Sequence, residues 1–483
     1  MMHALRPVFL ANGLLLLILG LSMLVPALLD VLVGHIDWQV FLAAAFFTSV
    51  AGGGLAVTSR GSEQALTLRN AFILTTSAWL VMPAFAALPF AFSELELSYT
   101  DAFFEAMSGL TTTGSTVITG LDTAPPGILI WRALLQWIGG IGIIVTAIAV
   151  LPTLGVGGMQ LFRLESSDSS EKVLPRSAQI AGTIGVLYVS LTGLCALAYW
   201  LAGMTGFEAA AHAMTTIATG GFSTSDASIG YFASASIDYI GTVFMIIGSM
   251  PFLLYFQALR GRPILLWRDS QVRWFLITLA VLVGAMALWQ TEANDVPAAD
   301  AIRLSAFNVV SILTGTGYST ADYALWGHFA VTVFFFITFV GGCAGSTSCG
   351  IKIFRFQVLY AATRTQLDSL LRPHGVFVPY FNRRPIPEAV MDSVMSFFFL
   401  FALSFAVLAL ALNQLGLDPL TAISGAATAI ANVGPGLGEI IGPAGTFKPL
   451  PDEAKWLLSA GMLLGRLELF TVLVMFTVSF WRD

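Results

Sequence analysis

Apolar stretches long enough to cross a lipid bilayer recur along this chain from one end to the other. A helix needs about 20 mainly apolar residues to cross the hydrocarbon core. Hydrophobic residues make up 57% of the 483 positions and charged residues only 10%, whereas soluble domains carry about 25% charged residues. The composition excludes an ordinary solvated surface and predicts an all-α polytopic membrane protein embedded in a lipid bilayer. Ten spans are expected: Pro7–Val33, Val40–Val57, Ala71–Phe92, Ile128–Leu151, Ile180–Met204, Tyr239–Leu259, Phe275–Leu288 and Phe329–Val340 each with its flanks, Val394–Leu415 and Trp456–Phe480.

The distribution of charge predicts how these spans are oriented. Cytoplasmic loops of membrane proteins are enriched in Lys and Arg, and four basic loops share one face if the chain starts in the cytoplasm. These loops hold Arg60 and Arg69; Arg163, Lys172 and Arg176; Arg260 to Arg273; and Lys352 to Arg384. The loops of the opposite face are rich in Asp and Glu, and the net charge is -6. We expect cytoplasmic N- and C-termini and an acidic outer face that concentrates cations.

After the first two spans, the chain repeats one unit four times: a span, a short apolar segment and a second span. The short segments are Ser98–Thr113, Thr205–Thr219, Pro297–Thr316 and Asp418–Val433. A helix of about 13 residues rises about 20 Å, which is too short to cross the bilayer, so we expect half-helices that enter from the outer face and turn back. The expected units are two N-terminal transmembrane helices in residues 1–66 and four pore repeats, in pseudo-fourfold array, in residues 67–160, 172–265, 270–365 and 386–483.

Each short segment ends at a glycine in a similar context. When the repeats are aligned on Gly114, Gly220, Gly317 and Gly434, the preceding residue is always β-branched. The separations are 220 − 114 = 106, 317 − 220 = 97 and 434 − 317 = 117, a period of about one hundred residues. Phe222–Asp226 also resembles Tyr318–Asp322. The candidate filter residues are Thr112, Thr113 and Gly114; Ala218, Thr219 and Gly220; Gly315, Thr316 and Gly317; and Asn432, Val433 and Gly434.

These segments have the chemistry of a cation pathway. Extended backbone at membrane depth is tolerated only where it is buried in protein or lines a wet cavity. Four such segments around one axis can direct carbonyl oxygens at a dehydrated cation and replace its water shell, and glycine permits the backbone angles that this requires. The half-helices direct the negative ends of their dipoles at the same axis. Each of these elements suits a cation and none suits an anion.

The pattern resembles the Trk/Ktr/HKT superfamily of potassium transporters, and in particular its Trk-type bacterial membrane subunits, over essentially the whole chain. The resemblance rests on the two additional N-terminal spans, the four filter segments and the ending Asn432-Val433-Gly434-Pro435-Gly436. It implies potassium uptake across the bacterial inner membrane, with potassium ions bound at the filter residues and one pore per subunit. It also implies a homodimer and a separate cytosolic nucleotide-binding protein that forms a regulatory ring. Some relatives with serine at the first filter glycine favour sodium, so by this resemblance Gly114 indicates potassium.

The run of small residues Gly341–Gly350 is a candidate gate. Each interior glycine costs a helix about 1 kcal/mol relative to alanine, and the run begins twenty-four residues after Gly317. Two interpretations are open: close packing of helices through small residues, or a broken helix whose loop crosses the permeation path. The length of the run favours the loop, and the resemblance implies an intramembrane gate. Its residues would be Gly341, Gly342, Gly345, Ser346, Thr347, Ser348 and Gly350.

Arg466 is the second candidate gate residue, because a cation at membrane depth costs at least about 2.5 kcal/mol on insertion scales and needs a partner or a wet cavity. It could pair with Glu468, two residues on, or extend to the membrane interface. The resemblance instead implies an arginine that faces the pore beneath the filter, beside the gating loop. We favour this second interpretation, with the guanidinium donating to loop carbonyls around Gly345 to Ser348.

A potassium symporter coupled to protons or sodium is the alternative, with Glu468 and His212 as candidate titratable groups. An enzyme is not expected, because the sequence holds no metalloprotease or nucleophile-elbow motif. It also holds no glycine-rich phosphate loop, so this chain is expected to bind no nucleotide, and no nucleic-acid partner is predicted. The cysteines Cys195, Cys343 and Cys349 are interpreted as small buried hydrophobic residues.

Overall fold

The computed structural model describes residues 5–61, 67–146, 158–159, 161 and 173–482, with the backbone alone described for 173–181. The secondary-structure elements within these residues are all helices except the two-residue strands β1 (Tyr380–Phe381) and β2 (Arg384–Pro385), which pair antiparallel; turns and irregular segments connect them. The transmembrane and loop helices are α1 Arg6–Ser22, α2 Leu24–Val33, α3 Trp38–Thr58, α4 Leu68–Ala86, α5 Leu88–Phe92, α7 Pro126–Val145, α10 Val173–Leu201, α12 Ala235–Gly248, α13 Phe252–Leu259, α14 Ile264–Arg268, α15 Ser270–Ala293, α17 His328–Ile337, α18 Ile353–Leu371, α19 Glu388–Gln414, α21 Asp452–Arg466, α22 Phe470–Leu473 and α23 Val478–Arg482. Short 3-10 turns lie at Leu121–Thr123, Ser228–Phe232, Tyr323–Trp326 and Val474–Phe476.

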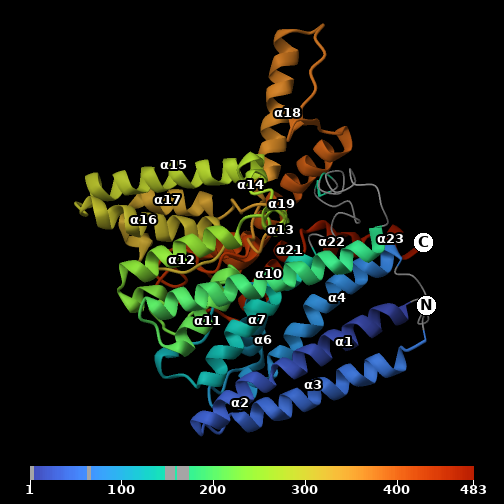
Figure 1. Cartoon of the computed structure of the whole chain (residues 1–483), viewed down its shortest axis with the longest axis vertical. Helices are drawn as coiled ribbons and strands as arrows, with labels where there is room; N and C mark the ends of the chain where they lie inside the picture. Colours follow the sequence, from blue (N-terminus) through green and yellow to red (C-terminus); the bar gives the residue numbers. More distant parts are fainter. Residues whose placement is uncertain (1–4, 62–66, 147–157, 160, 162–172, 483) are drawn as a thin grey trace.

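The helices correspond to the ten expected spans. Among the described residues, seven are long and apolar enough to cross a membrane, and two bent helix pairs bring the number to nine. The tenth expected span is represented by α17, an apolar helix of 10 residues. The N-terminal end of α1 and helix α23 lie on the same side of the molecule in Figure 1. The end of the fourth predicted span, residues 147–151, lies outside the described residues, as do Arg163, Lys172 and the predicted repeat limit at residue 160.

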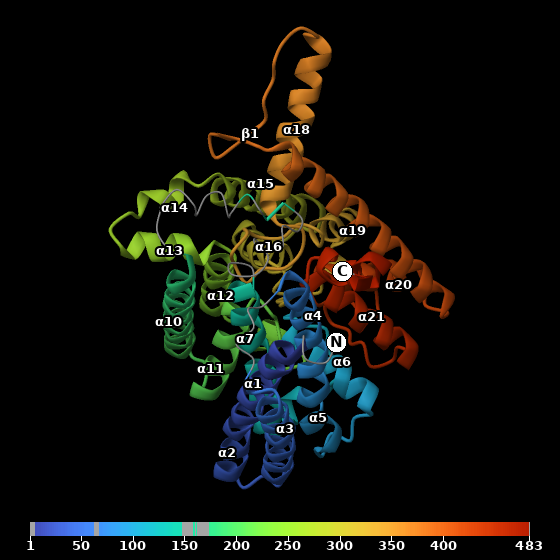
Figure 2. The same cartoon turned by 90° about the vertical axis from the view of Figure 1, so that its right-hand side faces the viewer.

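The four repeats surround a common centre (Figure 2), with α1 to α3 packed outside them. Contacts between neighbouring repeats close the ring: α7 packs on α11, α12 on α16, and α21 on α6. Between the third and fourth repeats, phenylalanines of α17 and of the following turn contact those of α19, as in the pair Phe339 and Phe405 at 5.2 Å between ring centroids. The all-helical, fourfold-repeated fold predicted from the sequence is confirmed.

The four predicted half-helices are α6 (Tyr99–Leu110), α11 (Gly206–Ile217), α16 (Ala298–Leu313) and α20 (Pro419–Ala431). Three of them begin at a side chain that caps the free N–H groups of the first turn. Ser98 accepts from the N–H of Asp101, Asp418 accepts from that of Thr421, and Thr205 forms a capping box with Glu208. With 12 to 16 residues each, these helices are too short to span the bilayer.

The second helix is broken in three repeats, whereas the sequence predicted a break only in the third. The predicted span Tyr239–Leu259 bends by 91° between α12 and α13, where Pro251 lacks a backbone donor and cannot continue the helix. The predicted span Trp456–Phe480 bends by 105° after α21, where Glu468 and Leu469 have positive φ values of 60° and 49°. Both continuous spans were therefore wrong predictions.

Helix α18 projects from the helical bundle and, with the hairpin of β1 and β2, forms an arm that both views show (Figures 1 and 2). It carries exposed Leu367, Leu370 and Leu371. The basic residues from Lys352 to Arg384 were predicted to lie together in one cytoplasmic loop. This was wrong for Arg355, which is buried at the base of α18 and forms an ion pair with Glu468.

Candidate ion filter and gate

The backbone after each half-helix repeats one conformation, which defines the register of the four filter segments. Positive φ values occur at Thr112, Thr219, Gly315 and Asn432, and again two residues later at Gly114, Gly221, Gly317 and Gly434. The residue between each pair donates its N–H to the carbonyl five residues earlier, as Thr113 does to Ser108 and Gly220 does to Thr215, each at 2.9 Å. The corresponding bonds of Thr316 and Val433 measure 2.8 and 3.1 Å.

This geometry corrects the alignment of the second repeat by one residue. Gly221, and not Gly220, is equivalent to Gly114, Gly317 and Gly434, and Ala218 lies one position before the segment, at the C-cap of α11. The expectation of a β-branched residue before every central glycine fails there, because that residue is Gly220. The sequence held the signal: Phe222–Asp226 aligns with Tyr318–Asp322 only when Gly221 aligns with Gly317. The expected alignment followed the β-branched residue instead.

The four segments form a closed ring. A methyl group on Gly114 would collide with the carbonyl oxygen of Gly220, and one on Gly221 would collide with that of Thr316. In the same way Gly317 faces the carbonyl of Val433, and Gly434 faces that of Thr113. Each central glycine thus lies against a carbonyl of the next repeat, which only a residue without a side chain permits at these φ values. When successive residues alternate between positive and negative φ values, their carbonyl groups can point to the same side of the backbone. In an extended strand, successive carbonyl groups point to opposite sides.

The ring contains strained residues, and hydrogen bonds between repeats join the segments beside them. Threonine at positive φ is an uncommon conformation that costs about 1–3 kcal/mol, and it occurs at both Thr112 and Thr219. Ser115 donates to the carbonyl of Gly434 at 2.7 Å, and Asn432 donates to the hydroxyl of Thr113 at 3.0 Å. These bonds join the first and fourth repeats, 319 residues apart in sequence.

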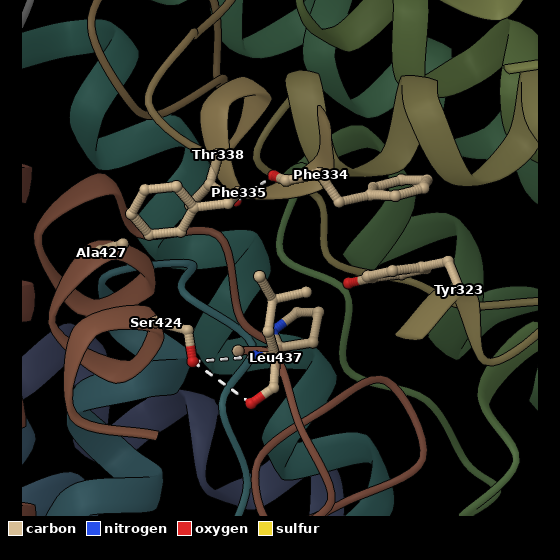
Figure 3. A pocket seen from close by; sticks show the side chains of 9 residues that line it. Tyr323, Phe334, Phe335, Thr338, Ser424, Ala427 and Leu437 are labelled. Atoms are coloured by element: carbon tan, nitrogen blue, oxygen red, sulfur yellow. Dashed lines mark hydrogen bonds between the residues drawn. The ribbon is translucent and has the colours of Figure 1, made fainter. Parts of the chain in front are cut away.

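The extended chain that follows the fourth segment is held in place by a side chain of α20. Ser424 of α20 accepts from the N–H of Leu437 at 3.0 Å and donates to its carbonyl at 3.3 Å. Figure 3 shows these two bonds beside a pocket between α17 and α20, where the rings of Tyr323 and Phe334 lie face to face. This pocket lies behind the strand, and its aromatic lining fits packing between the third and fourth repeats.

Between α17 and α18, residues 338–352 form a loop, as the glycine-rich run predicted. Its base is closed by hydrogen bonds from Gly341 to the carbonyl of Ile351 at 2.9 Å and from Ile353 to that of Gly342 at 3.0 Å. Its tip is anchored to the break in the second repeat. Cys343 donates to the carbonyl of Ser249 at 3.0 Å, and the hydroxyl of Thr347 donates to that of Gly248 at 2.9 Å.

The loop lies directly against the filter segments. The Cys349 Sγ is 3.5 Å from the hydroxyl of Thr112, and a methyl group on Gly315 would approach the Cβ of Cys349 to 3.3 Å. Thr347 also donates to the carbonyl of Ile217, the last residue of α11, at 3.0 Å. The loop therefore contacts segments of the first three repeats at the ends of their half-helices. Ser346, Thr347 and Ser348 are all buried in these contacts.

Arg466 lies beside the loop, as predicted, but its partners differ from those expected. Its Nη1 donates to Cys349 Sγ at 2.7 Å and its Nη2 donates to the carbonyl of Gly139 at 3.1 Å. The expected bonds to carbonyls of Gly345 to Ser348 are not among them, and the carbonyl of Ser348 accepts from Lys352 instead. Pairing with Glu468 is also not seen, because the break after α21 turns that carboxylate towards Arg355.

These side chains line a small cavity under the loop. Its wall includes Ser348 and Cys349 together with Lys352, Arg355, Arg466 and Glu468. Three cationic groups and one carboxylate give this space a positive character. Arg466 was expected here from the sequence, whereas Lys352, Arg355 and Cys349 were not predicted in this cavity. The partners of a buried charged group come from helices that are far apart in the sequence, so the sequence alone does not identify them. The prediction that all three cysteines are buried is confirmed.

Glycines in the second helices of the first and fourth repeats allow close packing against the half-helices. A methyl group on Gly139 would overlap the carbonyl of Leu110, and one on Gly465 would overlap that of Ile430. Gly461 lies against Leu408 and Ala429. The second helices of the first and fourth repeats thus approach the C-terminal ends of α6 and α20 at backbone distance.

Comparison with known proteins agrees with this architecture. The chain is 47% identical to the Trk system potassium uptake protein TrkI of Halomonas elongata, covering 99% of this chain and 97% of that protein. It is 41% identical to the Trk system potassium uptake protein TrkH of Escherichia coli, with 98% of each chain covered. The crystal structure of the potassium transporter TrkH from Vibrio parahaemolyticus superposes with a TM-score of 0.92 at 39% identity, covering 99% of both chains.

The sequence profile of the TrkH family, described as cation transport protein, matches residues 37–482. This confirms the resemblance stated from the filter segments and the expectation that the chain is not an enzyme. The chain belongs to the TrkH family of cation transport proteins.

Proposed function

We propose that the protein is a potassium-selective uptake pore of the bacterial inner membrane, with cytoplasmic N- and C-termini. The ion would pass the ring formed by Thr112 to Gly114, Thr219 to Gly221, Gly315 to Gly317 and Asn432 to Gly434. The observation that carries this proposal is the closed ring in which each central glycine lies against a carbonyl of the next repeat. Such a ring can supply the oxygens that replace the hydration shell of a dehydrated cation. The relatives named as potassium uptake proteins supply the choice of ion.

The proposed gate is the loop Gly341–Gly350 with Arg466. Support comes from its position against Thr112 and Gly315 and from the positive cavity beneath it. A cation that leaves the filter would meet the loop backbone and then fixed positive charges, so both must be displaced or neutralised before it can pass. Opening would break the contact between Arg466 and Cys349.

Passive conduction is favoured over symport because both candidate titratable groups, Glu468 and His212, are already bound to partners within the protein. The carboxylate of Glu468 is paired with Arg355. Both ring nitrogens of His212 are within hydrogen-bond distance of partners, the carbonyl of Glu208 at 2.8 Å and the hydroxyl of Ser223 at 3.0 Å. A coupling group must exchange its proton with water, and these contacts hold both side chains in structural roles.

We further propose a homodimer and a cytosolic nucleotide-binding partner, with the nucleotide bound by that partner and not by this chain. The arm formed by α18 and the hairpin supports this, because it extends from the bundle and exposes apolar side chains such as Leu371, which is 80% exposed. Exposed apolar patches mark interaction surfaces in soluble regions of proteins. Arg364 and Arg372 lie on the same arm.

Ion flux into proteoliposomes that contain only this chain tests the function. Uptake of ⁸⁶Rb⁺ should exceed that of ²²Na⁺, and it should run down a potassium gradient alone when pH and sodium are equal on both sides. Deletion of Gly345 to Ser348 should raise the flux and keep the rubidium preference. Chloride flux, an equal sodium flux, or a requirement for a proton or sodium gradient would contradict the proposal.

A further inference from the structure

The second filter segment lacks the side chains that brace its counterparts in the first and third repeats. The fourth segment, with Ala431 and Val433 at these positions, lacks them as well, but its Asn432 donates to the hydroxyl of Thr113 in the first repeat. In the first repeat the hydroxyls of Thr111 and Thr113 are 2.7 Å apart, and in the third repeat those of Thr314 and Thr316 are also 2.7 Å apart. Each pair ties the segment to the end of its own half-helix. The equivalent positions of the second repeat are Ala218 and Gly220, so no such hydroxyl pair can form there.

Gln136 of α7 occupies the space behind that segment. Its side chain is fully buried, its Nε2 donates to the carbonyl of Gly220 at 2.5 Å, and its Oε1 accepts from the N–H of Phe222 at 3.0 Å. A methyl group on Gly220 would overlap the Gln136 Cδ. The φ of Gly220 lies outside the left-handed region, unlike the 80° of Gly221. Gly220 is therefore a glycine because Gln136 fills the side-chain space, and not because its backbone requires one.

The same helix holds the segment at a second point one turn earlier. Arg132 Nη1 donates to the carbonyl of Ser223 at 2.7 Å, and its guanidinium lies 4.1 Å from the ring centroid of Phe222. Its Nε pairs with the buried Glu105 at 2.8 Å. Residues four apart lie on one face of a helix, so Arg132 and Gln136 bind consecutive parts of one strand. The second segment is positioned by the first repeat.

We infer that Gln136 is a positioning residue for ion selectivity, an inference that rests on the proposed potassium filter. The carbonyl of Gly220 is the counterpart of those of Thr113, Thr316 and Val433. A donated hydrogen bond fixes the direction of this oxygen and draws charge from it, which changes the field it presents to a dehydrated cation. One quadrant of the ring is thereby held by a side chain of a neighbouring repeat instead of its own.

Two variants isolate this role. Gln136→Met keeps the volume and removes both hydrogen bonds, so the ratio of ⁸⁶Rb⁺ to ²²Na⁺ uptake should fall about two- to twelvefold, the range of one neutral hydrogen bond. Gln136→Ala with Ala218→Thr and Gly220→Thr gives the second segment the hydroxyl pair of the first and third and clears the space for it. This triple variant should recover at least half of the wild-type ratio, while Gly220→Thr alone collides with Gln136 and loses uptake.

The matched control is Gln290→Ala, which removes another buried glutamine at the end of α15, where it bonds Asn294. Its uptake ratio should equal that of the wild type. An unchanged ratio in Gln136→Met would overturn the inference, as would a triple variant no better than Gln136→Ala alone. If Gln136→Met does not fold, the triple variant decides. A wild-type protein without rubidium preference would instead refute the proposed function, and with it the role of Gln136, whereas a selective wild type with an unchanged Gln136→Met ratio refutes the role of Gln136 alone.

Discussion

Replacement of Arg466 by alanine should raise the potassium flux of the isolated protein. Arg466 is 3% exposed and binds the loop through the contact between its Nη1 and Cys349 Sγ, while its contact with the carbonyl of Gly139 connects it to α7. Only the contact with Cys349 has to break when the loop moves aside. The closed state therefore loses this bond in the variant, and the open state loses nothing comparable.

The size of the effect follows from the strength of that bond. A hydrogen bond to a charged group contributes about 1.5–3 kcal/mol, and 1.4 kcal/mol corresponds to about a factor of ten in an equilibrium constant. The ratio of open to closed channels should rise about 10- to 150-fold, and the flux should rise by the same factor while the open state remains the minor one. Removal of the positive charge from the cavity acts in the same direction.

Rubidium uptake into proteoliposomes without any regulatory protein measures this change, normalised to the amount of folded protein. Cys349→Ala is the matched variant, because it removes the loop side of the bond and keeps the charge. An increase in both variants assigns the effect to the bond, and an increase in Arg466→Ala alone assigns it to the charge. Unchanged flux in both folded variants would refute the argument and leave Arg466 a packing residue.

Three further predictions follow from the same geometry. Lys352→Met removes the donor to the Ser348 carbonyl and should raise rubidium uptake several-fold, about the effect of one hydrogen bond; lower uptake would show that the lysine is needed for conduction. Gly114→Ser and Gly221→Ser each place a side chain against a carbonyl of the next repeat, so both should lower the rubidium-to-sodium uptake ratio. An unaltered ratio in Gly221→Ser would contradict the corrected alignment of the second repeat. Glu105→Ala leaves Arg132 buried without its carboxylate and should cost about 3–5 kcal/mol, seen as a lower melting temperature in detergent; an equal melting temperature would show that the ion pair contributes no net stability.

Local patterns in the sequence were sufficient to predict the architecture. Among the described residues, nine of the ten stretches located by hydropathy are apolar enough to cross a membrane, two of them as bent helix pairs, and the length of the short segments identified four half-helices that cannot cross the bilayer. The capping residues Ser98, Thr205 and Asp418 marked three of their starts. These properties depend on residues within one or two helical turns of each other, so the order of residues along the chain contains them. The same holds for the glycine-rich loop, whose composition alone disfavours a helix.

The tertiary structure decided the details that depend on distant partners. It showed that Gly221 and not Gly220 is the central glycine of the second segment, that two further spans are broken, and that Arg466 contacts Cys349 while Glu468 pairs with Arg355. Gln136 had no distinguishing sequence signal, because its partner Gly220 is 84 residues away. A buried polar group must find a hydrogen-bond partner, but which one it finds depends on how the helices pack. The position of a charge or amide in the sequence shows that a partner is needed, and only the folded chain shows which group provides it.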